Sequence, residues 1–179
     1  MTRPPGPTHR GAALALLFVD IELGRDGRFH AMAARRGTEE QVWTGLSFDA
    51  AHDRLAAWLR PDDILVGHNL QRFDRPAIAE RRPSSPLLDL PTLDSLVLSV
   101  LAFPSRPYHR LTKDDRLVRD ALPDPLSDVR ASQRVLEDAV GALAALPHAE
   151  TDVLASLIGV AELHARIDAG EVGPHALPD

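Results

Sequence analysis

The first apolar stretches of the chain follow the pattern of buried strands. Residues 12–19 form an unbroken apolar run, which predicts a central strand that is buried on both faces. A turn at 24–27 leads into residues 28–34, which we expect to form a hairpin with this strand, and residues 41–43 fit a short third strand. Residues 63–67 predict a fourth strand that ends at a glycine.

Helical spacing dominates the rest of the chain. We expect Ser47 to cap a helix whose apolar residues recur every three or four positions, and Pro61 to end it. Of the later helices, one has Pro76 in its first turn and another has Ser127 as its N-cap. These further predicted helices cover 72–82, 92–101, 110–119, 127–146 and 151–167. The order of the elements implies an α/β fold, a sheet with helices packed on it.

The length of 179 residues suits one domain of ordinary size. Residues 1–11 are rich in proline and glycine and are expected to form a flexible N-terminal tail. We expect the domain itself to cover 12–147, an extra C-terminal helix to cover 148–169, and a second flexible tail to cover 170–179.

Composition and charge exclude several classes of protein. The chain has 20 Lys plus Arg and 26 Asp plus Glu, so its formal net charge is −6. This charge argues against nucleic-acid binding through bulk positive charge, but not against an enzyme that contacts nucleic acid at a metal site. The absence of cysteine excludes disulfides, zinc–thiolate sites and cysteine nucleophiles. The absence of cysteine is compatible with a reducing cytoplasm, where we expect the protein to lie. The apolar run at 12–19 is far shorter than the ~20 residues of a membrane span, so we expect no membrane partner.

Two acids end the predicted central strand. Asp20 and Glu22 are two residues apart, so their side chains are expected on the same face, roughly 6.6 Å apart along the chain. Sites in open α/β sheets lie at this carboxyl end of the strands. Burying two carboxylates costs several kcal/mol each unless a cation compensates, and Mg²⁺ and Mn²⁺ prefer carboxylate oxygens. The alternative is a solvent-exposed strand end with two ordinary surface acids.

Two further acids stand at predicted helix starts. Asp74 follows the sequence Gly67-His68-Asn69 at the end of the fourth predicted strand, and it could equally be an acid that interacts only with the helix dipole. Asp128 lies at the margin of the core-facing stripe of its helix, where the alternative is a second capping residue. The pattern of residues alone leaves both alternatives open.

Together these segments resemble the DEDD (DnaQ-like) 3′–5′ exonucleases. Phe18-Val19-Asp20-Ile21-Glu22 resembles the first motif of that superfamily. Gly67-His68-Asn69 followed by Phe73-Asp74 resembles the second, and Pro125-Leu126-Ser127-Asp128 followed by Ala131 resembles the third. The resemblance implies a ribonuclease H-like fold, in which the first three strands of a mixed sheet are antiparallel.

The resemblance also implies a site and an activity. Asp20, Glu22, Asp74 and Asp128 are the expected ligands of two Mg²⁺ or Mn²⁺ ions, and the expected reaction is hydrolysis of phosphodiester bonds at DNA or RNA 3′ ends. The charges agree with this, since four carboxylates carry −4, two divalent ions carry +4, and the carboxylates alone would repel one another.

The sequence departs from the family at the general base. The family has a histidine five residues before the last acid or a tyrosine four residues before it, and these positions hold Pro123 and Asp124. Proline cannot accept a proton, and Asp124 would need a raised pKa to do so. His109 is the displaced candidate base, and its alternative is a surface or substrate-side histidine.

Several residues are candidates for substrate contact. His68 and Asn69 are expected to bind the substrate, and Arg106, Arg110 and Lys113 to contact phosphates, although the three cations could also be solvated surface charge. The segment 108–117 resembles an exonuclease branch found fused to helicases, so a helicase or another DNA-processing protein is a candidate partner. We expect Asp94 to be a structural N-cap, and the aromatic residues to lie in the core rather than stack on bases, namely Trp43, Trp58 and Phe73.

Two other functions compete with an active exonuclease. The first is a catalytically weak module of the same fold that binds a nucleic-acid end or a partner protein, and the missing base at 123 and 124 favours it. The second is an α/β binding protein whose acids match the motifs by accident. A structure that places Asp20 and Asp128 on opposite sides of the sheet would favour that function.

Overall fold

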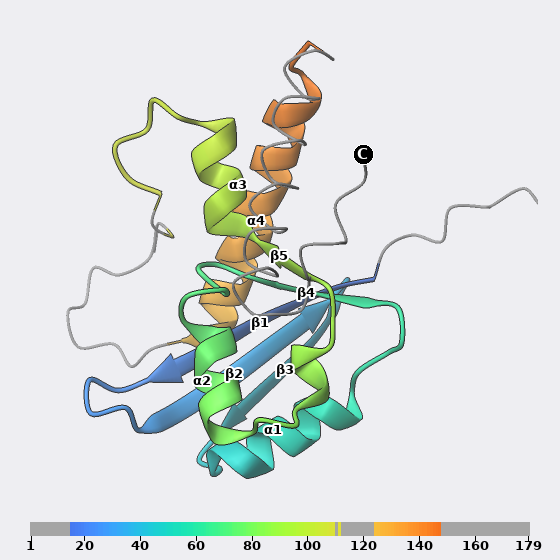
Figure 1. Cartoon of the computed structure of the whole chain (residues 1–179), viewed down its shortest axis with the longest axis vertical. Coiled ribbons are helices and arrows are strands. Elements are labelled where there is room, and N and C mark those ends of the chain that lie inside the picture. The colour runs from blue at the N-terminus through green and yellow to red at the C-terminus, as the bar shows by residue number, and fades with distance from the viewer. Residues whose placement is uncertain (1–14, 110, 112–123, 148–179) are drawn as a thin grey trace, which may run out of the picture.

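One mixed sheet organises the structure, a computed structural model that describes residues 15–109, 111 and 124–147. Within these residues the strand order is β3-β2-β1-β4-β5 (Figure 1). The antiparallel pairs are β1 with β2 and β2 with β3, and the parallel pairs are β1 with β4 and β4 with β5. The strands are β1 (Ala15–Leu23), β2 (Phe29–Arg36), β3 (Glu39–Thr44), β4 (Asp63–Gly67) and β5 (Thr92–Asp94). The predicted α/β sheet with three antiparallel first strands is confirmed.

The apolar run predicted as the central strand over 12–19 lies in β1 from Ala15 onward, and β1 continues beyond it to Leu23 and pairs with a strand on each side. Its alternate residues enter two separate cores. Leu17, Val19 and Ile21 belong to one buried cluster, and Phe18 belongs to the other, with Val129. Because side chains alternate along a strand, Asp20 and Glu22 continue the row of Phe18.

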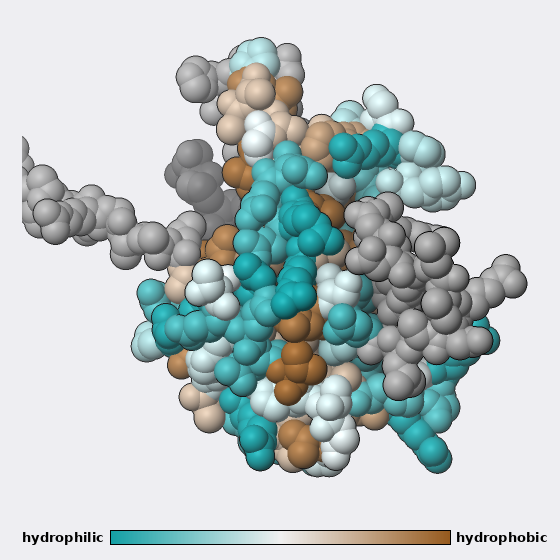
Figure 2. Space-filling view, turned by 180° about the vertical axis from the view of Figure 1, so that it is seen from behind, coloured by the Kyte–Doolittle hydropathy of each residue, from teal (hydrophilic) through white to brown (hydrophobic). Residues whose placement is uncertain are grey.

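Helices cover both faces of the sheet. α1 (Phe48–Ala57) and α2 (Asp74–Arg81) contribute to the first cluster, together with the 3₁₀ helix η1 (Pro86–Leu88). α4 (Pro125–Ala144) packs on the second cluster, and α3 (Ser95–Ala102) packs along α4. Figure 1 shows α3 and α4 rising together beyond the sheet. The outward face of α4 is hydrophilic in Figure 2, and its exposed charged residues are Arg130, Arg134, Glu137 and Asp138.

The predicted helix over 92–101 is wrong in its first three residues. Thr92–Asp94 form strand β5, because they pair in parallel with Leu65–Gly67 of β4. Asp94 then ends the strand and caps α3, and its carboxylate accepts a hydrogen bond from the backbone nitrogen of Leu96 at 3.0 Å. The prediction that Asp94 is an N-cap is therefore confirmed.

The predicted N-cap at Ser127 is also wrong. α4 begins at Pro125, and its N-cap is Asp124, whose Oδ1 accepts from the backbone nitrogen of Leu126 at 3.1 Å. Proline is favoured at the first helical position because its ring presets φ and no hydrogen bond is lost there. Ser127 is therefore an exposed residue of the first turn.

The other helix starts agree with the pattern more closely. Ser47 caps α1 by accepting from the backbone nitrogen of Ala50, and Pro76 stands in the first turn of α2. The helices predicted over 110–119 and 151–167 and the tails at 1–11 and 170–179 lie outside the described residues. No helix in the described ranges is long and apolar enough to cross a membrane.

Candidate metal centre

Three carboxylates meet at the end of the central strand. Asp20 and Glu22 from β1 and Asp128 from α4 each offer one oxygen, and these oxygens all lie within 4.8 Å of one another. Asp20 and Glu22 are half-buried and Asp128 is buried. The two elements bring them together because α4 lies on the face of β1 that carries Phe18. Asp20 and Asp128 therefore lie on the same side of the sheet, and the arrangement that would favour an accidental match of motifs is not found.

The start of α4 also favours a negative charge at this point. Asp128 lies in the first turn of the helix, where the backbone dipoles place a partial positive charge. Its neighbour Val129 is fully buried in the core with Phe18, which fixes the turn against β1. Asp128 is thus held at the site by its position in the packing and is not the N-cap of its helix.

Asp74, the fourth predicted ligand, lines the same cavity from the first residue of α2. It is only 2% exposed, and its Oδ1 accepts a hydrogen bond from the backbone nitrogen of Ile21 at 3.1 Å. Burial raises the pKa of Asp74 to about 7, against the opposing effect of the Ile21 hydrogen bond and with smaller contributions from the charges of Asp94 and Glu22. The structure thus brings Asp74 to the site, but not into the group of three converging oxygens.

A cavity of about 670 Å³ opens beside these acids. One part of its wall is acidic and another is apolar. The apolar side chains come from the start of α2, from α3 and from the segment after α3, and they are Phe73, Leu96, Val100, Pro107, Tyr108 and Leu111. Such a wall suits a base or sugar, while the acidic wall suits a cation.

The prediction for Phe73 was wrong. Phe73 was expected in the core, but the residue is 48% exposed and lines the cavity. The physical reason is its place at the N-cap of α2, directly before the buried Asp74, since neighbouring residues at a helix start point in different directions. Trp43, in contrast, is buried as expected, and Trp58 is half-buried with the Arg36 guanidinium over its ring.

The segment Gly67-His68-Asn69 has a backbone reason for its composition. A Cβ at Gly67 would lie 3.1 Å from the Leu70 Cβ and 3.3 Å from the carbonyl oxygen of Val19, so a larger residue would press on Leu70 and β1, and these would have to move by a few tenths of an ångström. Asn69 has a φ of 67°, a left-handed conformation that asparagine tolerates better than most residues. Its backbone nitrogen donates to Asp94 Oδ1 at 2.9 Å. The turn therefore directs both His68 and Asn69 into the cavity wall.

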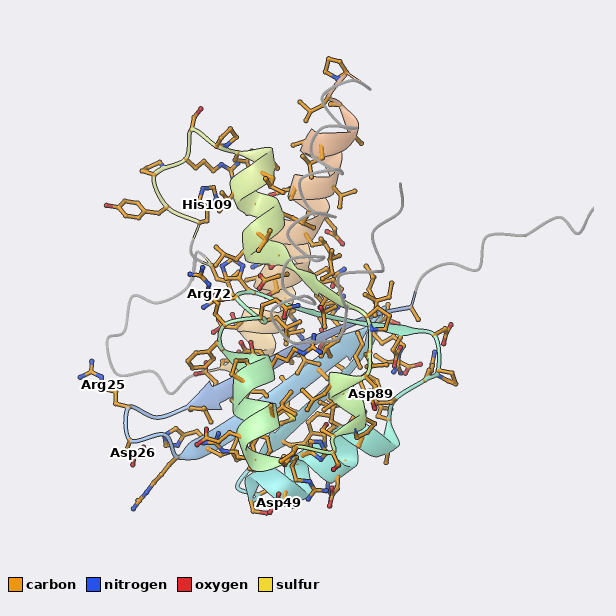
Figure 3. All side chains as sticks on the ribbon, viewed as in Figure 1. Arg25, Asp26, Asp49, Arg72, Asp89 and His109 are labelled. Atoms are coloured by element: carbon orange, nitrogen blue, oxygen red, sulfur yellow. The ribbon has the colours of Figure 1, made fainter. Side chains whose placement is uncertain are left out.

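Two histidines line the cavity. His68 is half-buried, and its Nδ1 lies 3.0 Å from Ser95 Oγ. Burial lowers its pKa. The Nδ1 of His109 lies 2.9 Å from Ser99 Oγ, and Figure 3 shows this histidine beside α3. His109 is thus a half-buried cavity residue rather than an exposed surface histidine.

The other predicted base and the predicted cations are placed differently. Asp124 is exposed and caps α4, and it is not among the described residues that line the cavity. Arg106 is also exposed and outside that lining, and its guanidinium carbon lies 3.6 Å from the centre of the Phe103 ring. Pro123, Arg110 and Lys113 lie outside the described residues.

Tyr108, Ser95 and Ser99 were not predicted as site residues. Tyr108 is 76% exposed at the cavity wall. The two serines are buried, and each bonds a cavity histidine. The sequence could have pointed to the two serines, because they are the only polar residues in the apolar sequence SLVLSVLA and stand four positions apart, on one face of a helix.

Comparisons with known proteins identify the fold. Neither a family model nor a curated protein sequence matches the chain. Among solved structures, E. coli exonuclease I in complex with a 5cy-dA13 oligonucleotide matches with a TM-score of 0.50 and 18% identity, over 72% of this chain and 40% of that one. A family B DNA polymerase from the archaeon Pyrobaculum calidifontis matches with a TM-score of 0.48 and 18% identity, over 72% and 25%.

The likeness to exonuclease I confirms the fold class, a ribonuclease H-like α/β fold. This chain spans less than half of that protein's length. At 18% identity the likeness concerns the fold, and the chemistry must be argued from the site of this chain itself.

Proposed function

We propose that this protein is a metal-dependent 3′–5′ exonuclease that hydrolyses phosphodiester bonds at DNA or RNA 3′ ends. The observation that carries the proposal is the convergence of Asp20, Glu22 and Asp128 within 4.8 Å at the end of the central strand. The fold shared with exonuclease I supports it.

The residues present fit divalent ions. Asp20, Glu22 and Asp128 offer only carboxylate oxygens, the donor type that Mg²⁺ and Mn²⁺ prefer. Asp74 would complete the ligand set for two ions, and burial, which raises the pKa of its carboxyl, disfavours its negative charge unless a cation lies nearby. When bound, the ions would supply electrostatic stabilisation of the phosphodiester and would lower the pKa of a water molecule.

The apolar wall would hold the end of the nucleic acid. Phe73 and Tyr108 present exposed rings at the cavity, and base–aromatic stacking is worth ~1–3 kcal/mol per base. His68 and Asn69 also line the cavity and would contact the terminal nucleotide. The net charge of −6 fits a protein that depends on its metal ions to attract the substrate backbone.

His109 would accept the proton of the attacking water. It lines the same cavity as the acids, and its Nδ1 is engaged by Ser99, which leaves Nε2 for the water. A base at His109 would explain how the protein could be active although it has no histidine at 123 and no tyrosine at 124.

A second candidate is a catalytically weak module that binds nucleic-acid ends or a partner protein. The observation that favours it is the cap at α4, because the carboxylate of Asp124 is used to hold the helix start and lies outside the described cavity lining. If His109 is not a base either, the chain has neither the histidine nor the tyrosine at the positions that the family uses for its base. A helicase partner and a cytoplasmic location stay predictions from the sequence.

A nuclease assay separates the two candidates. The purified full chain is incubated with 3′- and 5′-labelled single-stranded DNA and RNA, with Mg²⁺, Mn²⁺ or EDTA. We expect products that shorten from the 3′ end, need metal, and disappear in Asp20→Ala. Asp138→Asn, an exposed acid on the outward face of α4, is the matched control and should keep full activity. Activity retained in Asp20→Ala refutes the proposal, and metal binding without cleavage establishes the second candidate.

A further inference from the structure

Helix α3 carries two buried serines on one face. Ser95 and Ser99 are four residues apart and are 0% and 3% exposed. Serine is a weaker helix former than the leucines and alanine of this helix, and a buried hydroxyl without a partner costs free energy. Their presence in an otherwise apolar helix therefore needs a reason, and packing alone does not supply one.

The reason lies in the two cavity histidines. Ser95 Oγ lies 3.0 Å from His68 Nδ1, and Ser99 Oγ lies 2.9 Å from His109 Nδ1. The histidines come from different loops, after β4 and after α3. One turn of α3 thus holds both rings at the wall of the acidic cavity.

The two cavity histidines also affect each other. Burial lowers the pKa of His68, and an interaction with the backbone of His109 opposes this effect. The ring of His68 therefore lies beside the segment that carries His109 as well as beside α3.

The positions of the two serines in α3 predict that the rings of His68 and His109 carry their proton on different nitrogens. Ser99 lies inside the helix, where a serine hydroxyl can donate to the carbonyl four residues back, so its oxygen can accept from an Nδ1–H of His109. Ser95 is the first residue of α3, so no helical carbonyl precedes it, and its hydroxyl can donate to His68 Nδ1. In a neutral His109 with Nδ1 protonated, Nε2 carries the lone pair that a general base needs.

We propose that Ser99 is a positioning residue, which holds His109 in the Nδ1–H tautomer with Nε2 directed at the cavity. The inference rests on the proposed nuclease function. It explains how a histidine displaced from the usual position of the family's base is kept in one orientation, although the neighbouring residues of its loop, 104–108, are exposed.

The kinetic test uses three substitutions in α3. Ser99→Ala is expected to lower kcat about tenfold and to change KM less than twofold, since one hydrogen bond of ordinary strength is lost and the substrate wall is unchanged. Ser99→Thr restores the hydroxyl and should recover most of kcat. Val97→Ala changes an exposed residue of the same helix outside the described cavity lining and should leave kcat unchanged.

The spectroscopic test reads the ring directly in the metal-free protein. Long-range ¹H–¹⁵N correlation spectra, assigned with His109→Gln, should show the Nδ1–H tautomer of His109 in the wild type and in Ser99→Thr, and a mixture in Ser99→Ala. If the wild type is active and Ser99→Ala keeps both the wild-type kcat and the Nδ1–H tautomer of His109, the positioning role of Ser99 is wrong, whereas the proposed nuclease function stands. A wild type that cleaves nothing with any metal overturns the proposed function, and the positioning role in hydrolysis with it.

Discussion

The carboxylate of Asp74 accepts a hydrogen bond from the backbone nitrogen of Ile21, the residue between Asp20 and Glu22, at 3.1 Å. The parallel pairing of β1 with β4 ends at Phe18 and Val66, so β1 runs on without a strand on that side. Asp74 supplies the hydrogen-bond acceptor that β4 no longer provides there. The start of α2 is thereby joined to the strand that carries two of the candidate metal ligands.

This relationship makes the stability of the metal-free protein depend on pH. The pKa of Asp74 is raised from its ordinary 3.8 to about 7 in the folded state, so the folded state binds more protons than the unfolded state between these values. The contribution of Asp74 to the free energy of unfolding is therefore fully present below pH 4 and is lost as the pH rises through 7. Each pKa unit corresponds to about 1.4 kcal/mol.

Asp74→Asn should remove this dependence, because an amide does not titrate but still offers an oxygen to Ile21. Urea unfolding in EDTA at pH 5 and pH 8 measures it, with Asp138→Asn as the control. We expect the wild type and the control to lose more stability between the two pH values than Asp74→Asn does. Equal losses in all three proteins contradict the account of Asp74.

His109→Gln tests the candidate base. Removal of a general base costs 10²–10⁴-fold in rate, so we expect kcat to fall at least 100-fold while KM changes only a few-fold. His30→Gln replaces an exposed histidine of β2, outside the described cavity lining, and serves as the control. Steady-state assays on a 3′-labelled strand separate kcat from KM, and a kcat within threefold of the wild type excludes His109 as the base.

Phe73→Ala tests the apolar wall. Loss of one stacking contact of ~1–3 kcal/mol should raise KM about 5- to 100-fold, with a smaller effect on stability because the ring is half exposed. Val140→Ala removes an exposed apolar side chain from α4 and should leave KM unchanged. Unchanged binding of a short oligonucleotide to Phe73→Ala, measured by fluorescence anisotropy, would show that the ring does not contact bases.

Gly67→Ala tests the close approach of the turn to β1. The added Cβ would press on Leu70 and on the carbonyl of Val19, and we expect a loss of about 1–3 kcal/mol in the free energy of unfolding. Gly141→Ala, where a Cβ meets nothing within 4 Å on α4, should instead stabilise the protein by about 1 kcal/mol. Chemical denaturation of both variants decides the matter, and a neutral Gly67→Ala would contradict the steric account.

Much of the fold was predictable because its strongest signals are local. The unbroken apolar run of β1 and the glycine exit of β4 mark the two strands that place Asp20, Glu22 and the His68 turn. β5 was not predictable, since three residues carry no period and their strand state depends on pairing with β4. The exposure of Phe73 likewise depends on the buried neighbour Asp74, which no hydropathy pattern shows.

The site was predictable as a set of acids but not as a geometry. The four acids follow from their motifs and their places at strand and helix ends. Oxygens of Asp20, Glu22 and Asp128 converge, whereas Asp74 lies outside this group. This arrangement depends on how α4 and α2 pack on β1. The histidine–serine pairs of α3 also form only in the folded chain, because 27 residues separate His68 from Ser95.

Direct titration of the full chain with Mn²⁺ is the most decisive test of the metal centre. Calorimetry or electron paramagnetic resonance would compare the wild type with Asp128→Asn and with the control Asp138→Asn. The convergence of Asp20, Glu22 and Asp128 predicts that the wild type and the control bind Mn²⁺ equally and that Asp128→Asn binds it at least tenfold more weakly. Equal Mn²⁺ affinity in all three proteins would show that these carboxylates are not the metal centre.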